Sequence, residues 1–289
     1  MRKNIAKKKR ASWLFMLPSL IGVLTFFVLP FFVVIYYSLV NNPIQHEFVG
    51  LENFIKVSQN GAYKLASSNT IKFSAIAVPL AVILSLFLAV VMESKIFFKS
   101  QFRTFFLTPM MVPIASIVLI WQVLFHYNGL VNTIVMAFGG GKTDWLKSND
   151  AQIVIIVLFL WKNLGYNMIL FMAALSSVPK DLLEVARLEN ASRLQIFWMI
   201  KMRYLSSTIL FVAIMSLINS FKVFREIYLL TGDYPYDSLY MLQHFMNNTF
   251  ASLDYQKLSA AAIMMALVIS ILVALMMIIE NWYGKDIEG

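Results

Sequence analysis

The stretch FSAIAVPLAVILSLFLAVVM, residues 73–92, contains no charged residue. An α-helix rises about 1.5 Å per residue, so about 20 apolar residues cross the roughly 30 Å of hydrocarbon in a bilayer. Lipid offers the backbone no hydrogen-bond partner, so a spanning run must be helical or belong to a closed barrel. Continuous apolarity, without the period-two alternation of barrel strands, favours the helix. The stretch therefore predicts a transmembrane helix.

The whole chain shares this character. Of its 289 residues, 60% are hydrophobic and 13% are charged, whereas soluble domains carry about 25% charged residues. Apolar runs of spanning length cover residues 14–38, 73–92, 105–125, 153–175, 209–230 and 258–279. We expect an all-α membrane protein with six transmembrane helices. Residues 1–13 form a basic segment, residues 14–282 the transmembrane domain and residues 283–289 a tail.

Basic residues set the expected orientation. Lys and Arg gather in residues 1–13 and in the links 93–104 and 176–205, and they are sparse in the other links. The positive-inside rule then places both termini and the loop 176–205 in the cytoplasm. The first run exceeds the apolar core of a signal peptide, about 7–15 residues, and no A-x-A type site follows it, so we interpret it as a retained helix.

Several other classes of protein are disfavoured. The chain has no cysteine, and His46, His126 and His244 are scattered, so no metal-ligand cluster is expected. The net charge of +9 is carried in short links rather than on a soluble basic face, so it indicates membrane orientation and no nucleic-acid partner. No catalytic constellation is evident for a membrane-embedded enzyme.

Residues 139–143, GGGKT, imitate the end of a nucleotide-binding P-loop. The G-x-x-x-x-G-K-[ST] spacing, however, puts Met136 where the first glycine belongs, and no buried strand precedes it. We interpret the segment as a flexible turn. If the protein uses ATP, another subunit must supply the ATPase.

The cytoplasmic loop contains LLEVARLENASRLQIFWMIKMRYL at residues 182–205. Asp181 and Glu184 suit the positive end of a helix dipole, and Pro179 suits a first helical turn. Small or apolar residues recur at three- and four-residue spacing on one face. This pattern leaves two interpretations: a helix lying on the inner leaflet, or a helix that docks onto a partner protein.

The order Glu184, Val185, Ala186, three residues, Asn190, nine residues, then Ile200, Met202 and Arg203 resembles the E-A-A-x-x-x-G-x9-I-x-L-P signature of permease subunits of binding-protein-dependent ABC importers. Further similar stretches are FVGLENF at 48–54, TPMMVP at 108–113, LWKNLGYNM at 160–168 and FKVFREIYLLTG at 221–232. Together they resemble the carbohydrate-importer branch, which includes the maltose and glycerol-3-phosphate permeases.

This resemblance implies the type I importer permease fold in a bacterial cell membrane. It implies a chain that is not an enzyme and holds no cofactor, paired with a second homologous permease, by preference in a heterodimer. Two cytoplasmic ATPase subunits would bind ATP and Mg, and an extracytoplasmic solute-binding protein would deliver a sugar or oligosaccharide. An ion-coupled secondary transporter is the alternative, although no isolated mid-span Asp or Glu supports a proton relay.

In that family the loop forms a coupling helix seated in the ATPase. The resemblance assigns this role to Glu184, Val185, Ala186, Asn190 and Ala191. Val185 replaces an alanine of the signature and Asn190 its glycine; since Asn tolerates left-handed conformations, we expect Asn190 to preserve a bend. Arg203 replaces proline, so we expect either a more continuous helix into the fifth span or an anchor at the headgroups.

The resemblance also implies a substrate pathway along the fourth and fifth spans. The aligned positions are Trp161, Asn163, Gly165, Asn219, Ser220 and Val223, with helix packing as the alternative role for Trp161 and Asn219. Aromatic rings interleaved with amides suit sugars.

Three further expectations concern charges and prolines in the spans. Lys222, Arg225 and Glu226 are expected near the outer headgroups, with Lys222 paired to Glu226. Pro109 and Pro113 are expected to kink the third span.

Overall fold

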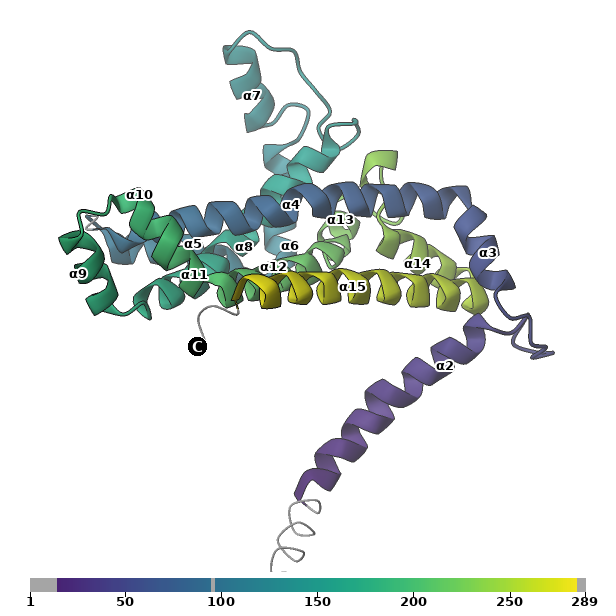
Figure 1. The fold of residues 1–289 in the computed structure, drawn as a ribbon. Coiled ribbons are helices and arrows are strands. Elements are labelled where there is room, and N and C mark those ends of the chain that lie inside the picture. The colour runs from purple at the N-terminus through teal and green to yellow at the C-terminus, as the bar shows by residue number, and fades with distance from the viewer. Residues whose placement is uncertain (1–14, 95–96, 285–289) are drawn as a thin grey trace, which may run out of the picture. The chain divides into compact units, whose positions relative to one another are not determined.

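The computed structural model describes residues 15–94 and 97–284 (Figure 1). Within these residues the chain is helical, with a single isolated antiparallel bridge between Val40 and Phe48. The all-α prediction is therefore confirmed for the described part. The predicted basic segment 1–13 lies outside it, as do residues 285–289 of the predicted tail.

Five of the described helices are long and apolar enough to span a bilayer, and each overlaps a predicted run. They are Phe15–Ser38, which contains η1 (Leu24–Val28) and α2 (Leu29–Ser38); α4 (Gly61–Glu93); α8 (Ala151–Ser176); Ser206–Thr231, which contains α12 (Ser206–Phe221) and α13 (Phe224–Thr231); and Tyr255–Trp282, within α15 (Tyr255–Gly284). The number rises to six if one bent pair of helices is counted as a single span.

That bent pair corresponds to the third predicted run. α5 (Lys99–Met111) and α6 (Ile114–Leu124) meet at an angle of 102°. Val112 between them is extended, with ψ of 131°, as a residue before proline prefers to be. Pro113 caps α6, while Pro109 stays inside α5. The expected kink at two prolines is thus a break at one of them.

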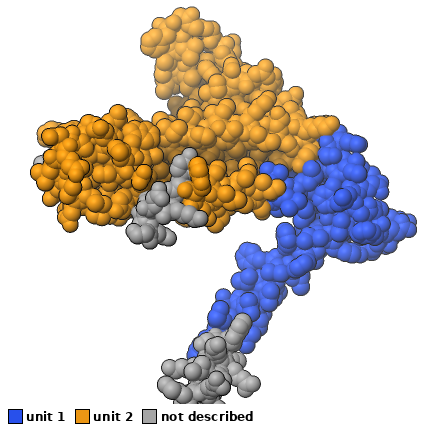
Figure 2. Space-filling view, in the orientation of Figure 1, with its two compact units in different colours: residues 1–60, 246–269 blue, residues 61–245, 270–289 orange. Residues whose placement is uncertain are grey.

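The chain divides into two compact units, residues 1–60 with 246–269 and residues 61–245 with 270–289 (Figure 2). In the first unit, the side chain of Asn53 on α3 (Glu52–Gln59) donates hydrogen bonds to the carbonyls of Ser38 and Val40 at 3.0 and 2.9 Å. These bonds hold α3 against the end of α2.

Shorter elements complete the chain: α7 (Leu130–Ala137), α9 (Lys180–Leu188), α10 (Arg193–Ile196), η2 (Phe197–Lys201), α11 (Met202–Tyr204), η3 (Asp237–Leu239) and α14 (Leu242–Ala251).

The second unit is built around α8. This helix packs along α4 and also contacts α5 and α12. One buried cluster includes Phe73 of α4 and Phe159 of α8, whose rings meet edge to face at 5.6 Å. A second cluster includes Met168 and Phe171 of α8 with Leu205 before α12. Apolar contacts on α8 therefore hold the surrounding helices together.

The backbones of α5 and α8 meet at Gly165. A Cβ atom added there would lie 1.9 Å from the carbonyl oxygen of Phe106. Real Cβ atoms do not approach a backbone oxygen so closely, and backbone cannot yield as a flexible side chain does. Only glycine fits this contact between the two helices.

Gly165→Ala is expected to destabilise the second unit by about 1–3 kcal/mol or more, the usual cost of overpacking. The measurement is the Tm of the detergent-purified chain. Gly61→Ala is the matched control, because a Cβ atom at Gly61 meets nothing within 4 Å and alanine favours a helix over glycine. Equal Tm values for the two variants would contradict the close contact.

Candidate functional site

The loop predicted to couple forms a short amphipathic helix, α9, after Pro179 (Figure 1). Leu183 faces inward and packs against the cluster of Met168 and Phe171. Apolar residues are also exposed among the charged residues on the outward side: Val185 is exposed and Leu188 is 83% exposed. None of the helix's residues is fully buried, so α9 is attached by one side and leaves these apolar residues uncovered.

Asn190 ends this helix in the left-handed conformation, with φ of 59°. The amide of Ala191 donates to the carbonyl of Ala186 at 2.9 Å, and the amide of Asn190 donates to that of Arg187 at 3.1 Å. These two bonds make a Schellman motif, which usually uses glycine at the left-handed position. The prediction that Asn190 preserves the bend is confirmed.

The chain then enters a second helical segment. Ser192 caps α10 through a reciprocal capping box with Gln195. The path continues through η2 and α11, which contains Arg203, and α12 begins at Ser206. Because Arg203 lies within a helix, the loss of the signature proline leaves a nearly continuous helical path into the fifth span, the first of the two expectations.

The loop is also tied to the second span by an ion pair. Nζ of Lys201 lies 2.6 Å from each carboxylate oxygen of Glu93, at the end of α4. A partly exposed pair of this kind stabilises by at most about 1 kcal/mol. It nevertheless holds Lys201 of the loop beside the end of α4. Together with Leu183 it gives the loop two attachments to the long helices α4 and α8.

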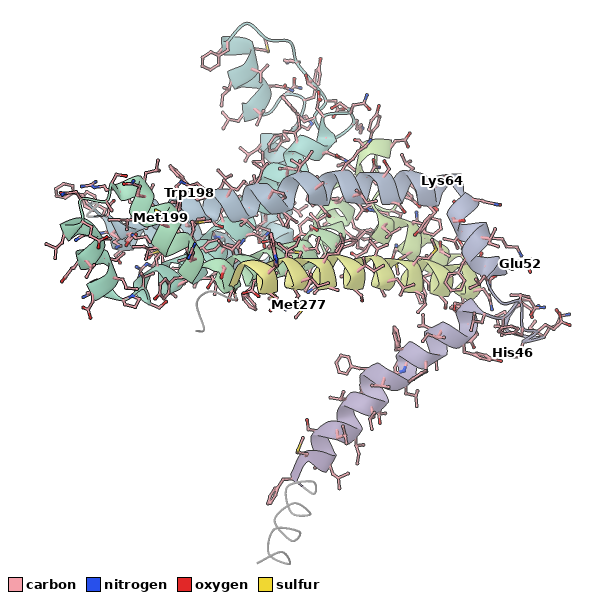
Figure 3. All side chains as sticks on the ribbon, in the orientation of Figure 1. His46, Glu52, Lys64, Trp198, Met199 and Met277 are labelled. Atoms are coloured by element: carbon pink, nitrogen blue, oxygen red, sulfur yellow. The ribbon has the colours of Figure 1, made fainter. Side chains whose placement is uncertain are left out.

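Of the predicted coupling residues, Glu184, Val185 and Asn190 are exposed, and Ala186 and Ala191 are half-buried. The structure thus brings all five to one short helix and its cap. Exposed apolar residues continue beyond them at Leu194 and Met199; Met199 is marked in Figure 3.

Polar side chains link α8 to α12 and α13, and we call this set the polar seam. It consists of three pairs. The side-chain amide of Asn219 donates to Asn163 Oδ1 at 3.0 Å. That of Asn167 donates to Ser216 Oγ at 3.0 Å. Lys162 and Glu226 form an ion pair. Polar groups within spans are costly and persist where neighbouring helices satisfy them.

The expected pairing of Lys222 with Glu226 is wrong, because Glu226 pairs with Lys162. α12 ends at Phe221 and α13 begins at Phe224, and this interruption changes the helical spacing between the two residues. Lys222 is exposed, whereas Glu226 is 7% exposed. The sequence did not predict two of the pairs, Lys162 with Glu226 and Asn167 with Ser216. The only signal was the presence of polar residues within apolar runs.

The predicted pathway residues fall into two groups. Gly165, Ser220 and Val223 are buried, and Ser220 Oγ lies 2.8 Å from Ser74 Oγ. Asn163 and Asn219 bond to each other and keep accessible surface.

Trp161 also keeps accessible surface, and its ring lies 5.2 Å from that of Trp121. The predicted set is therefore close together, and Trp161, Asn163 and Asn219 are its accessible members.

The GGGKT segment folds as a turn after α7. The side chain of Asn132 donates to the carbonyl of Thr143 at 2.8 Å, and Lys142 Nζ donates to Asn128 Oδ1 at 2.8 Å. These partners lie on α7 and just before it, and no strand precedes the segment among the described residues. The interpretation as a turn is confirmed, and its flexibility stays a prediction.

Titratable side chains do not gather into a metal site in the described part of the chain. His244 on α14 is isolated among apolar and aromatic neighbours. Burial lowers the pKa of His244 to about 4, so its imidazole is neutral at physiological pH. Its Nδ1 accepts a hydrogen bond from the amide of Met241 at 3.2 Å.

The sequence matches the family model described as "Binding-protein-dependent transport system inner membrane component" over residues 77–289. It is 27% identical to the probable ABC transporter permease protein YurN of Bacillus subtilis (strain 168), over 98% of this chain and 99% of that protein. It is 29% identical to the trehalose/maltose transport system permease protein MalF of Thermococcus litoralis, over 79% of each chain.

A solved structure shows the same fold. It is a chain of a bacterial alginate ABC transporter in complex with an alginate pentasaccharide-bound periplasmic protein. The TM-score is 0.83 at 19% sequence identity, and 98% of each chain is covered.

The cap of α9 gives a testable prediction. Asn190→Val places a β-branched residue at positive φ, which costs about 1–2 kcal/mol, so amide exchange across residues 186–192 should accelerate. Asn190→Gly, which has no Cβ, should keep the exchange slow. Hydrogen–deuterium exchange with mass spectrometry measures both, and equal protection in the two variants would rule out the left-handed cap.

Proposed function

Because the chain belongs to the family of binding-protein-dependent transport system inner membrane components, we propose that it is a permease subunit of an ATP-driven carbohydrate importer. It forms half of the translocation pathway and catalyses no reaction itself. ATP and Mg bind in two separate cytoplasmic ATPase subunits. A second, homologous permease completes the pathway, in a heterodimer.

The proposed topology has six spans, with α5 and α6 counted as one bent span. Both termini lie in the cytoplasm, on the side of the basic links. Residues 14–282 make the transmembrane domain, with the coupling loop at 176–205. The domain resides in the bacterial inner membrane, and lipid surrounds its apolar surface.

The observation that carries the proposal is the exposure of apolar residues on α9, Val185 and Leu188 among them. An exposed apolar patch marks a contact surface, and the ATPase is the partner that covers it. The alternative, α9 lying on the inner leaflet, is less well supported, because Asn190 and Ser192 cap two successive helices and so define a rigid shape. Docking needs such a shape, whereas lipid binding does not.

Motion from the ATPase reaches the spans through the two attachments of the loop. Leu183 packs against a buried cluster that includes residues of α4 and α8, and Lys201 is paired to Glu93 on α4. A capped helix with two such attachments transmits a rigid-body displacement to α4 and α8. These are the helices that bear most of the core of the second unit.

The transported solute is a sugar or oligosaccharide delivered by an extracytoplasmic solute-binding protein. Trp161 offers an aromatic surface for the C–H face of a sugar ring, and the amides of Asn163 and Asn219 suit its hydroxyl groups. The transporters of trehalose or maltose and of alginate noted above support this class of solute. Family membership favours it over the ion-coupled alternative.

Val185→Arg is expected to uncouple transport, because a long charged side chain at this exposed position of α9 would separate the helix from its partner. ATP-dependent uptake in reconstituted vesicles should fall to background, and stimulation of the ATPase by loaded binding protein should be lost. Ser100→Arg, at an exposed position on α5 outside the loop, is the matched control. Undiminished uptake by the Val185 variant would refute the docking assignment.

Asn219→Leu is expected to lower uptake several-fold or more, since an unsatisfied polar partner costs about 1–3 kcal/mol. The partner here is Asn163, so Asn163→Leu should have a similar effect. Thr208→Val, on the same helix but away from the polar seam, should leave uptake unchanged. Initial rates of labelled-sugar uptake at matched expression test this, and normal rates in the Asn219 variant would remove it from the pathway.

A further inference from the structure

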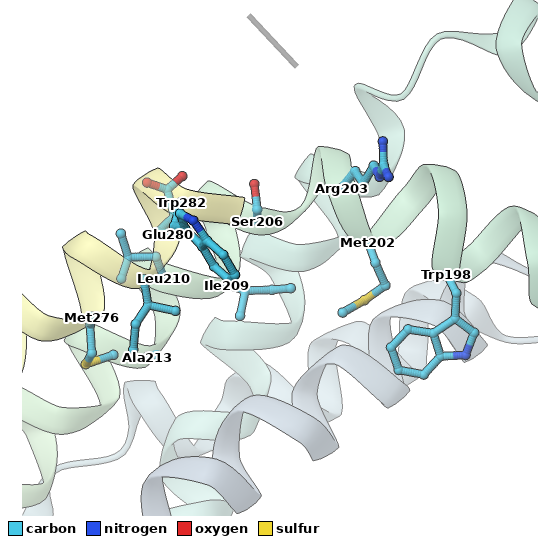
Figure 4. A pocket seen from close by; sticks show the side chains of 11 residues that line it. Trp198, Met202, Arg203, Ser206, Ile209, Leu210, Ala213, Met276, Glu280 and Trp282 are labelled. Atoms are coloured by element: carbon cyan, nitrogen blue, oxygen red, sulfur yellow. The ribbon is translucent and has the colours of Figure 1, made fainter. Parts of the chain in front are cut away.

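A cavity of about 680 Å³ opens in the second unit, where the second helical segment of the loop meets the start of α12 and the last turns of α15 (Figure 4). Its volume lies within the range of about 300–1,000 Å³ typical of ligand pockets. None of the predicted coupling or pathway residues lines it. It shares the second helical segment of the loop with the site already described, but it contains none of that site's predicted residues.

The cavity is polar along one edge and apolar elsewhere. Figure 4 shows the guanidinium of Arg203 and the carboxylate of Glu280 directed to the same side, with the hydroxyl of Ser206 between them. The side chains of Ile209 and Met276 lie on the opposite side. The lining thus separates charge from hydrocarbon, as an amphipathic ligand requires.

The two charges are placed for an external partner. Ser207 Oγ donates to Glu280 Oε1 at 2.7 Å, which fixes the carboxylate at the edge of the cavity. Arg203 has no carboxylate within ion-pair distance among the described residues. An arginine in this setting favours phosphate, which its planar guanidinium binds through two hydrogen bonds.

The position in the chain points to lipid. The cavity lies at the ends of two spanning helices, and Trp198 and Trp282 line it. Tryptophan is enriched where a membrane protein crosses the boundary between headgroups and hydrocarbon. An amphipathic ligand at this depth is a membrane phospholipid.

We propose that the cavity binds one phospholipid whose headgroup carries both a phosphate and an ammonium group, with the phosphate at Arg203, the ammonium at Glu280 and an acyl chain over Ile209 and Met276. A lipid whose headgroup carries a phosphate but no ammonium group would leave the carboxylate of Glu280 without a cation. An apolar helix of another subunit would leave both charges unpaired, which is costly. The proposal does not depend on which solute the chain transports.

The test uses the full chain, purified from membranes in mild detergent with any subunits that stay bound. After delipidation, phosphatidylethanolamine or phosphatidylglycerol with identical acyl chains is added, and native mass spectrometry measures the fraction of chains that retain one lipid. Wild type should retain phosphatidylethanolamine preferentially. Retention of both lipids to the same extent, or of neither, would overturn the proposal.

Variants test the two headgroup contacts. Arg203→Ala should lower retention of phosphatidylethanolamine about tenfold or more, as expected for loss of a hydrogen bond to a charged group, whereas Arg203→Lys should restore part of it and show that the fold is intact. Glu280→Gln should abolish the preference for phosphatidylethanolamine over phosphatidylglycerol. Arg103→Ala, which removes an exposed arginine from α5, is the matched control. If Arg203→Ala and Arg103→Ala retain lipid equally, the cavity does not select this headgroup.

Discussion

Hydrocarbon offers a polar side chain no hydrogen-bond partner, so each amide or charge within a span must find one on a neighbouring helix. α8 carries Lys162, Asn163 and Asn167, and all three are satisfied by α12 or α13. These bonds fix the rotation of α8 about its axis. That rotation in turn brings Gly165 against α5, where the two backbones touch. The rotation of α8 in the second unit therefore depends on its polar residues as well as on its apolar contacts.

The spans and the cap of α9 were predictable from sequence because both depend on local physics. Apolar length alone predicts a spanning helix, and the tolerance of asparagine for positive φ is a property of the residue itself. The partners across the polar seam were not predictable, since pairing depends on which helices become neighbours. Glu226 shows the difference: local spacing indicated Lys222, and a helix interruption that no motif announces brought Lys162 to it.

The predicted pathway shows a related limit. Alignment with a family pattern transfers positions, but it does not say which way a side chain points. Ser220 and Val223 are adjacent to the accessible Asn219 in space, yet both are buried within the chain's own packing. Buried residues support a surface, whereas accessible residues form it. Only the three-dimensional structure shows which residues are buried.

The break between α5 and α6 has its own consequence for how the chain sits among its neighbours. A helix that stops leaves its last carbonyl groups without intrahelical donors. The extended Val112 and the proline after it, which has no amide hydrogen, cannot supply them. Irregular backbone at membrane depth is tolerated only beside protein or water, never against acyl chains. In the proposed topology, where α5 and α6 form one span, the corner at Val112 and Pro113 would have to face protein or water and not lipid.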